Sequence, residues 1–371
     1  MTWNWQQPDW PYFTYDKSRL EPLEARLQHE SGLLFGAFKH LDSDDKTLLT
    51  VDLIGNEALK TSEIEGEYLD RDSLQSSLRR HFGLDAGSGR IQPAEQGIAD
   101  MMVDLYRSFH EPLSHAMLFS WHRLLMSGSH ALHDLGRYRT HAAPMQVVSG
   151  RIDAPKVHFE APPSDQVPDE MDRFLAWFNA TAPDGPSPLP ALTRAGIAHL
   201  YFVCIHPFED GNGRLGRAIA EKALAQGLGN PTLTALAYTI ERNRKAYYAA
   251  LEAANRANEI TAWLAYFADT VLDAQRYTQR RIELLIEKTK LFGRLAGRLN
   301  ARQEKALARM FREGPEGFAG GLSAEKYIHL TRASRATATR DLHDLVILGA
   351  LTRTGERKHT RYHLNLPVPD G

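Results

Sequence analysis

The sequence contains one cysteine, no long apolar run and no Walker-type loop, and each absence excludes a class of protein. With Cys204 alone the chain cannot form an intrachain disulfide or a metal site of several cysteines, and its place in an apolar run indicates buried packing. No apolar run reaches the roughly eighteen residues of a membrane span, and the N-terminus lacks the basic and apolar regions of a signal peptide. We therefore expect a cytoplasmic protein. The pattern GxxxxGK[ST] does not occur, which excludes a P-loop.

The composition is that of an ordinary globular protein with an uneven distribution of charge. The 371 residues leave room for two or three domains, and 43% hydrophobic residues are enough to form hydrophobic cores. The net charge is −2, but its distribution is uneven. Between Lys290 and His363 there are fifteen Lys and Arg and seven Asp and Glu, an excess of eight positive charges. The rest of the chain is therefore acidic by about ten charges. Only the C-terminal part has the charge that contact with nucleic acid favours.

Helical periodicity of apolar residues dominates the sequence and predicts a mainly α-helical fold. After an extended aromatic arm over 1–14, the expected helices cover 16–40, 43–60, 70–80, 93–109, 113–126, 168–179, 188–204, 212–228, 238–255 and 260–290. The periodicity fails over 141–163, where two short extended runs around a turn predict a β-hairpin or flap. The open edge of such a hairpin is either covered by neighbouring elements or used to pair with the backbone of a partner.

Three carboxylates, Glu63, Glu65 and Glu67, follow the second expected helix. The segment 61–69 combines N-cap residue types with an acidic turn. On position alone we interpret the three carboxylates as residues at a helix start, where the helix dipole favours them.

The basic C-terminal part has the pattern of a winged helix-turn-helix. Helical segments over 303–311, 324–330 and 334–348 precede two strand-like runs around Gly355. The candidate recognition helix carries Arg335, Thr337, Thr339 and Arg340. Because this shape serves protein contact as well as DNA contact, binding to DNA and a role in dimerisation or packing are both open.

The densest polar chemistry lies in the stretch His206-Pro-Phe-Glu-Asp-Gly-Asn-Gly-Arg-Leu-Gly-Arg217, directly after a buried apolar run. The spacing predicts a loop that enters a helix at about Asn212, with bare glycine backbone and arginines in the first turns. Free N–H groups and the positive end of a helix make such a start a phosphate site.

The stretch also matches the dinucleotide fingerprint GxGxxG, but the match is weak. That fingerprint needs a βαβ unit among parallel strands, whereas the pattern of this chain predicts a succession of helices. In addition, Asp210 precedes the glycines and would repel pyrophosphate unless a cation such as Mg²⁺ lay between them. His206 is then a candidate general base, since the pKa of imidazole lies near neutrality. The alternative, a core histidine at a helix stop, is less favoured because Asp210, Asn212, Arg214 and Arg217 follow closely.

The residues of this stretch resemble the signature HPFx[DE]GNGRxxR of the Fic family, enzymes that transfer AMP from ATP to protein hydroxyls. The resemblance implies a general base at His206 and a metal ligand at Asp210. It also implies ATP, Mg²⁺ and a set of nucleotide-binding residues: Asp210, Gly211, Asn212, Gly213, Arg214, Leu215, Gly216, Arg217, Tyr247, Asn255 and Ser149. It further implies that the hairpin is a flap that aligns the target peptide by strand addition through Val147, Val148 and Gly150, within 147–152.

A second motif, Thr61-Ser-Glu-Ile-Glu-Gly66, resembles the family's inhibitory pattern [ST]xxxE[GN]. The implied role of Glu65 is to pair with Arg217, which reverses our interpretation of this carboxylate from position alone. The resemblance extends over about 33–268. It implies an N-terminal arm and helices over 1–92, a catalytic core over 93–290 and a winged-helix domain over 291–371.

We therefore expect an autoinhibited protein adenylyltransferase that modifies Ser, Thr or Tyr hydroxyls of proteins, itself included. Expected partners are protein substrates, a second copy of the chain in a homodimer, and DNA at the winged helix. The alternatives are an enzyme of the same fold that removes AMP, with Glu65 positioning water, and a DNA-binding regulator whose core senses a nucleotide.

Overall fold

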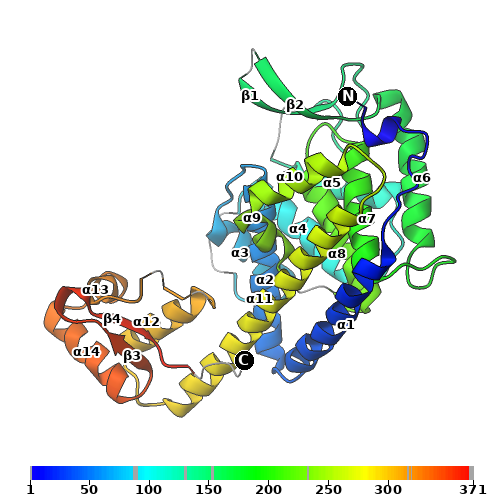
Figure 1. Cartoon of the computed structure of the whole chain (residues 1–371). Helices are drawn as coiled ribbons and strands as arrows, with labels where there is room; N and C mark the ends of the chain where they lie inside the picture. The colour runs from blue at the N-terminus through cyan, green and yellow to red at the C-terminus, as the bar shows by residue number, and fades with distance from the viewer. Residues whose placement is uncertain are drawn as a thin grey trace. The chain divides into compact units, whose positions relative to one another are not determined.

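The computed structural model describes residues 2–86, 91–128, 132–151, 154–231, 234–315, 317–318 and 320–366. The chain forms two compact units, Met1–Thr278 and Gln279–Gly371. Both are mainly helical, and each contains one two-stranded antiparallel sheet (Figure 1). The predicted fold class is therefore confirmed. None of the helices in the described ranges is long and apolar enough to cross a membrane.

The helices of the first unit enclose one large apolar core. They are α1 Lys17–Lys39, α2 Ser43–Ile64, α3 Arg71–His81, α4 Pro93–Ser108, α5 His115–Leu125, α6 Val167–Ala180, α7 Ala191–Ile205, α8 Asn212–Leu228, α9 Leu236–Arg242 and α10 Arg244–Ala254. The long helix α11 Thr261–Arg294 begins in this unit and continues into the second. Sequence periodicity predicted one helix over 238–255, whereas the structure divides it at Asn243.

Helices α7 and α8 form the centre of this unit and carry the stretch 206–217 between them (Figure 1). Almost every residue of α7 is buried, which explains its mainly apolar sequence. It ends at His206, whose left-handed backbone (φ 51°) turns the chain before Pro207. Gly211, also left-handed (φ 81°), is the residue before α8 and permits a tight entry into that helix.

The end of α2 corrects one prediction from the sequence. The helix runs through the acidic segment to Ile64, with Glu65 as its C-cap residue and Gly66 in a left-handed conformation. Glu63, Glu65 and Glu67 thus lie at a helix C-terminus, where the dipole disfavours carboxylates, and not at a helix start. Nearby cations are therefore needed to offset this placement.

The hairpin predicted within 141–163 is confirmed as β1 Gln146–Arg151 paired with β2 Ala154–Glu160, with an irregularity between Val147 and Val148. Both of these valines are exposed. Ile152, the last residue of the predicted flap segment, lies outside the described residues. The hairpin lies at the edge of the helical unit (Figure 1).

The aromatic N-terminal arm packs on the core, as its composition indicated. Trp3 and Trp10 are buried, and the Trp10 ring N–H donates to the Glu170 carboxylate at 3.0 Å. The Asn4 side chain donates to the sulfur of Cys204 at 3.2 Å. Cys204 is fully buried, so its predicted packing role is confirmed, and burial raises the pKa of its thiol to about 12.

The second unit has the predicted winged helix-turn-helix order of elements. Helices α12 Ala301–Arg312, α13 Ala324–Thr331 and α14 Arg335–Ile347 are followed by the hairpin β3 Leu351–Thr354 and β4 Arg361–Leu364. Their apolar faces enclose a separate core that includes Leu307, Tyr327 and Leu342. A bridge between Leu322 and Tyr362 ties the hairpin to the segment before α13.

Candidate active site

His206 lies at the C-terminus of α7 with one ring nitrogen engaged. Its Nδ1 is 3.2 Å from the carbonyl oxygen of Val203, so the tautomer that donates there leaves Nε2 as a free acceptor. Burial lowers the pKa of His206 to about 4, and the charge of Arg139 acts in the same direction. The imidazole is therefore neutral at physiological pH, which is the state that a base requires.

Arg139 holds the backbone of the His206 turn. It is 1% exposed, and its guanidinium donates to the carbonyls of His206 at 2.8 Å and Pro162 at 2.6 Å and to the Ser164 hydroxyl at 2.8 Å. Its own N–H donates to the carbonyl of Pro207 at 3.0 Å. No sequence pattern singles out this residue, because an isolated arginine 67 positions before the histidine carries no local signal.

The loop after His206 is closed by the Asn212 side chain. The side-chain oxygen accepts from the Phe208 N–H at 2.9 Å, and the side-chain N–H donates to the Phe208 carbonyl at 2.8 Å. The Phe208 ring is fully buried and stacks on His122 with ring centroids 4.2 Å apart. The Asn212 amide group therefore shapes the loop, whereas the resemblance implied that it lies at the phosphates.

Asp210 is the most accessible carboxylate of the loop. One oxygen accepts from the N–H of Gly211 at 2.6 Å, the other lies 3.7 Å from Arg214, and the side chain is 59% exposed. An exposed carboxylate beside a phosphate site suits Mg²⁺, which takes one or two carboxylates together with phosphate oxygens. Asp210 can thus fill the metal-ligand role that the sequence suggested.

A cluster of His133, Asp134 and Glu209 has a spacing that would permit a metal ion. The Glu209 carboxylate already accepts from the N–H groups of His133 and Asp134. The Asp134 carboxylate accepts from Arg137 and Thr140, which holds its pKa at about 2 despite burial. These contacts give the cluster a structural role in the turn that precedes Arg139.

The start of α8 presents backbone N–H groups and two buried arginines. Because the first N–H groups of a helix have no intrahelical acceptor, those of Gly213 and Arg214 are available to an anion. Arg214 is ion-paired with Glu67, and Arg217 is 2% exposed. Nε of Arg214 and Nη1 of Arg217 are buried and have no hydrogen-bond acceptor within the described part of the chain. Such buried donors suit phosphate oxygens.

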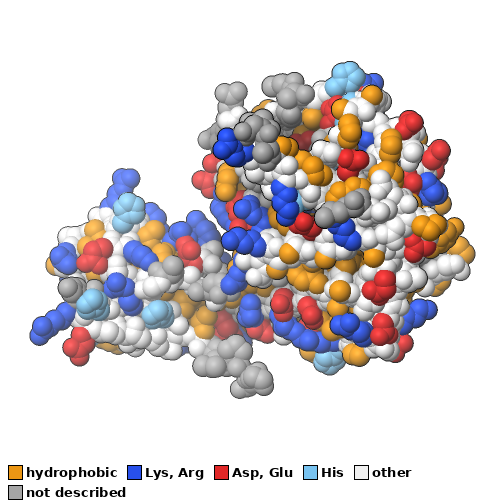
Figure 2. All heavy atoms as spheres, turned by 45° about the horizontal axis from the view of Figure 1, so that its top comes forward, with side chains coloured by type: hydrophobic (Ala, Val, Ile, Leu, Met, Phe, Trp, Pro, Cys, Tyr) orange, Lys and Arg blue, Asp and Glu red, His pale blue; other side chains and the backbone are white. Residues whose placement is uncertain are grey.

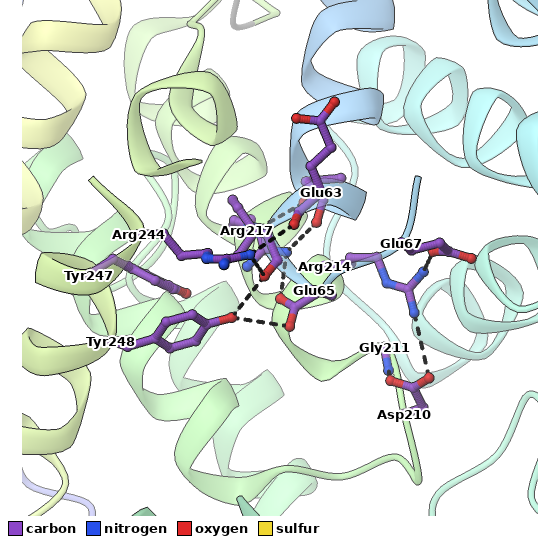
Figure 3. Close-up of polar contacts among 12 residues, drawn as sticks. Glu63, Glu65, Glu67, Asp210, Gly211, Arg214, Arg217, Arg244, Tyr247 and Tyr248 are labelled. Atoms are coloured by element: carbon purple, nitrogen blue, oxygen red, sulfur yellow. Dashed lines mark hydrogen bonds and ion pairs between the residues drawn. The ribbon is translucent and has the colours of Figure 1, made fainter. Parts of the chain in front are cut away.

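Glu65 occupies the space beside Arg217 (Figure 3). Its carboxylate accepts from Nη2 of Arg217 at 2.8 Å, and Nε of Arg217 donates to the Thr61 hydroxyl at 2.7 Å. A methyl group built on Gly213 would lie 2.2 Å from the same Glu65 oxygen, so only glycine permits this approach. Burial opposes ionisation, but the Arg217 charge and hydrogen bond outweigh it and hold the pKa of Glu65 below its usual value.

Two residues of α10 hold the end of α2 in place. Arg244 donates to the carbonyls of Glu63 at 3.3 Å and Ile64 at 3.4 Å, and the Tyr248 hydroxyl donates to the Ile64 carbonyl at 3.2 Å. Tyr248 also lies 3.4 Å from the second oxygen of Glu65. Figure 3 shows both side chains pointing at the end of α2. The helix-end carbonyls and the carboxylate are thus satisfied together.

A cavity of about 610 Å³ lies beside His206 and Glu65. Its lining includes residues that the sequence assigned to nucleotide or target binding, namely Tyr247, Asn255, Gly213, Ser149, Val147 and Val148. The buried Tyr247 hydroxyl is bonded to His199 at 2.7 Å, and the side-chain oxygen of Asn255 accepts from Cys204 at 3.2 Å. These two residues therefore have fixed positions in the wall.

Leu215, Gly216 and Gly150 are among the predicted residues that do not line this cavity. Leu215 is fully buried in the core, and Gly216 packs so closely that an added methyl group would lie 2.8 Å from Val203. Gly150, in β1, pairs with Pro155 across the hairpin. Gly216 thus allows α8 to lie close against α7.

The hairpin is tied to α10 by His158, a residue that no sequence motif marks. Its Nε2 lies 2.6 Å from the Ser149 hydroxyl, and its Nδ1 lies 2.9 Å from the Glu252 carboxylate. Lys156 adds an exposed ion pair with Glu252 at 3.4 Å. These contacts fix Ser149 in the cavity wall.

Comparison with known proteins identifies the class to which this site belongs. Residues 112–224 match the model of the Fic/DOC family, and residues 3–84 match a domain of unknown function, DUF4172. The chain thus contains a region that matches the Fic/DOC family model and an N-terminal region that matches DUF4172, and it is distantly similar to Fic adenylyltransferases.

The curated relatives cover parts of the chain. It is 26% identical over 182 residues to protein adenylyltransferase fic-1 of Caenorhabditis elegans, a match that spans 48% of this chain and 30% of the relative. It is 32% identical over 99 residues to protein adenylyltransferase Fic of Drosophila melanogaster, which spans 27% of this chain and 18% of the relative. The chain thus matches less than a third of the length of these two relatives.

Solved structures share the fold. A Fic family protein from Desulfovibrio desulfuricans G20 superposes with a TM-score of 0.51 at 21% identity, over 94% of this chain and 97% of that one. A Fic domain-containing signaling protein from Bacteroides thetaiotaomicron superposes with a TM-score of 0.51 at 18% identity, over 68% of this chain and 98% of that one. At these identities the likeness concerns the fold alone.

Proposed function

We propose that the protein transfers AMP from ATP to hydroxyl groups of proteins and that Glu65 inhibits this transfer. The observation that carries the proposal is the position of His206, whose side chain borders a cavity of about 610 Å³ beside the start of α8. Buried donors of Arg214 and Arg217 at this helix start suit a polyphosphate. The match to the Fic/DOC family model supports the same reaction class.

In the proposed reaction a hydroxyl oxygen of the target attacks the α-phosphorus of ATP. A bond forms between that oxygen and phosphorus, the bond from the α-phosphorus to the bridging oxygen of the β-phosphate breaks, and pyrophosphate leaves. Nε2 of His206 takes the hydroxyl proton, a contribution worth roughly 10²- to 10⁴-fold in rate. The helix N–H groups and Arg217 hold the polyphosphate in line for this attack.

Asp210 would hold Mg²⁺ through its exposed carboxylate. When bound, the ion supplies positive charge that offsets the repulsion between Asp210 and the phosphates. The loop that carries Asp210 is held in place by the two hydrogen bonds between the Asn212 side chain and the Phe208 backbone.

The proposed inhibition follows from the contacts of Arg217. Glu65 and Thr61 occupy two of its donors, which are then unavailable to a phosphate of ATP. A tethered carboxylate competes at roughly millimolar effective concentration, so it displaces a nucleotide contact of modest strength. ATP then binds in a pose that His206 cannot use.

Incubation with ATP labelled at the α-phosphate tests the transfer itself. Label should enter the wild-type protein or added proteins, and His206→Ala should abolish it. His329→Ala removes an exposed histidine of the second unit and serves as the matched control. Equal labelling by wild type and His206→Ala would refute the role of His206.

Removal of AMP is the second candidate activity. It is favoured by the place of Glu65 in the lining of the same cavity as His206, where a carboxylate can position water. A target that carries AMP distinguishes the two activities, because hydrolysis yields free AMP and reversal with pyrophosphate yields ATP. Release of AMP that depends on Glu65 would support the second activity.

A further inference from the structure

The second unit contains a helix-turn-helix whose second helix has two different faces. Helices α13 and α14 are joined by a short turn in which Arg332 adopts a left-handed backbone (φ 56°). The Ser334 hydroxyl caps α14 by accepting from the N–H of Thr337 at 3.2 Å. Ala338, Leu342 and Leu345 point into the core of the unit. The opposite face of α14 is left in solvent.

The exposed face of α14 is cationic and has small side chains. It carries Arg335, Ala336, Thr339, Arg340 and His343, all of them exposed. The small Ala336 and Thr339 allow the helix to approach a surface closely. Thr337, which the sequence placed on this face, is half-buried and bonded to the Ser334 hydroxyl at 2.9 Å, so His343 takes its place.

The first acidic residue of α14 is turned away from this face. Asp341 is 3% exposed and accepts from Arg302 at 2.8 Å, the Tyr327 hydroxyl at 3.0 Å and Asn300 at 3.1 Å. Its negative charge is therefore neutralised inside the unit. A polyanion at the exposed face meets the cations without this carboxylate.

The hairpin after α14 adds cations beside the helix. β3 and its turn expose Arg353 and Arg357, and β4 exposes His363, whereas Glu356 is the one acidic residue between 345 and 366. Over 279–371 the sequence has eighteen Lys and Arg against ten Asp and Glu, while the whole chain has a net charge of −2. Figure 2 shows more Lys and Arg than Asp and Glu side chains on the visible face of this unit.

We propose that this unit binds duplex DNA, with α14 in the major groove and the β3–β4 hairpin against the backbone. A helix with arginines at its N-terminal turns suits base edges and phosphates, and the groove of B-form DNA is wide enough to admit it. A duplex of A-form RNA has a major groove too narrow for a helix. The charge excess favours a polyanion over a neutral protein surface. This activity is independent of the proposed transfer reaction.

Fluorescence anisotropy of the full chain with labelled duplexes tests the proposal. A pool of short random-sequence DNA is first enriched for bound sequences, and the affinity is then measured at about 50 and about 200 mM salt. Binding should weaken by at least about 100-fold at the higher salt, since cations that contact phosphates release counterions. Duplex RNA of the same sequence should compete weakly.

The double variant Arg335→Ala/Arg340→Ala should weaken binding by at least about tenfold and reduce the salt dependence. The matched control Lys305→Ala/Arg312→Ala removes two exposed cations from α12 and should retain the wild-type affinity. Thermal melting shows whether each variant is folded, and Arg335→Gln/Arg340→Gln replaces any variant that is not. Absence of salt-dependent DNA binding, an equal loss in both double variants, or equal competition by duplex RNA would overturn the proposal.

Discussion

The Glu65 carboxylate lies 2.8 Å from Nη2 of Arg217, although the two residues are 152 positions apart in the chain. Glu65 is the C-cap residue of α2, where the helix dipole disfavours a carboxylate. The Arg217 charge offsets that cost and holds the pKa of Glu65 below its usual value despite burial. A phosphate that binds Arg217 therefore has to displace the Glu65 carboxylate, which the Arg217 charge stabilises.

Under the proposed inhibition, replacing Glu65 should raise the rate of AMP transfer. In Glu65→Gly, Arg217 loses a charged hydrogen bond, an interaction worth about 1.5 to 3 kcal/mol, and becomes available to phosphate. We expect transfer from labelled ATP to rise by about 10- to 150-fold, which is this energy expressed as a rate ratio. Initial rates at saturating ATP provide the measurement.

Glu63→Gly is the matched control for that experiment. Glu63 lies in the last turn of α2, two residues before Glu65, and its carboxylate pairs with Lys60. Its removal introduces the same glycine into the same helix end without freeing Arg217, so transfer should stay near the wild-type rate. Similar activation in both variants would show that loosening of the helix end, and not loss of the carboxylate, is responsible.

The pH profile of transfer should lack a limb from His206 in the neutral range. Its pKa is lowered to about 4, so the neutral, proton-accepting form predominates above that value and is lost below it. We expect that titration of His206 causes no change in kcat/KM of Glu65→Gly between about pH 6 and 8. A limb near the ordinary pKa of imidazole that disappears in His206→Ala would contradict this.

Arg139 should affect the chemical step and leave nucleotide affinity unchanged. Arg139→Lys retains the charge but loses the planar group that binds two carbonyls and a hydroxyl around the His206 turn. We expect kcat to fall by about 10- to 100-fold with KM for ATP nearly unchanged, since misplacement of a catalytic group by about 1 Å has such an effect. Arg137→Lys, at an exposed arginine nearby, is the control. A rise in KM for ATP alone would refute this role.

A buried pair of carboxyl groups, Glu57 and Glu221, should make stability depend on pH. Burial raises the pKa of Glu57 to about 7, and burial together with the charge of Glu57 raises that of Glu221. Each pKa is raised above its unfolded value, so the folded state binds more protons. The free energy of unfolding is thus highest below about pH 4.5 with respect to these groups and falls as pH rises through about 7.

Glu221→Gln tests this pair, because it removes one ionisable group and keeps the shape. At pH 8 the variant should be more stable than the wild type by about 1 to 3 kcal/mol, and at pH 5 the difference should nearly vanish. Urea unfolding at the two pH values gives both free energies. A variant that is less stable at pH 8 would indicate that the pair contributes through a charge that Gln cannot replace.

The sequence predicts the parts of this protein that depend on local patterns. The periodicity of apolar residues places most helices, and the stretch His206 to Arg217 indicates a phosphate site because its residue types are dense and their spacing is fixed. The hairpin is also recovered, since the helical period is interrupted there. These features require information from only a few neighbouring residues.

Other features depend on contacts between distant segments. Position alone placed the Glu65 segment at a helix start, because N-cap residue types and acidic residues coincide there, yet the tertiary contacts of α2 extend the helix to Ile64. Arg139 and His158 act through carbonyls and carboxylates up to 94 positions away. The Asn212 side chain points back to Phe208, an orientation that spacing does not specify.

The helix that carries Glu65 is also part of the protein's core, since most residues of α2 from Leu49 to Ile64 are buried. Under the proposed inhibition, the Glu65 carboxylate therefore cannot diffuse away, and its partner Arg217 belongs to the same chain. The fraction of molecules in the blocked state is then the same whether a cell makes few copies of the protein or many. Synthesis of more protein therefore does not lower the blocked fraction. A higher activity per molecule requires a change in the contacts that hold the last turn of α2.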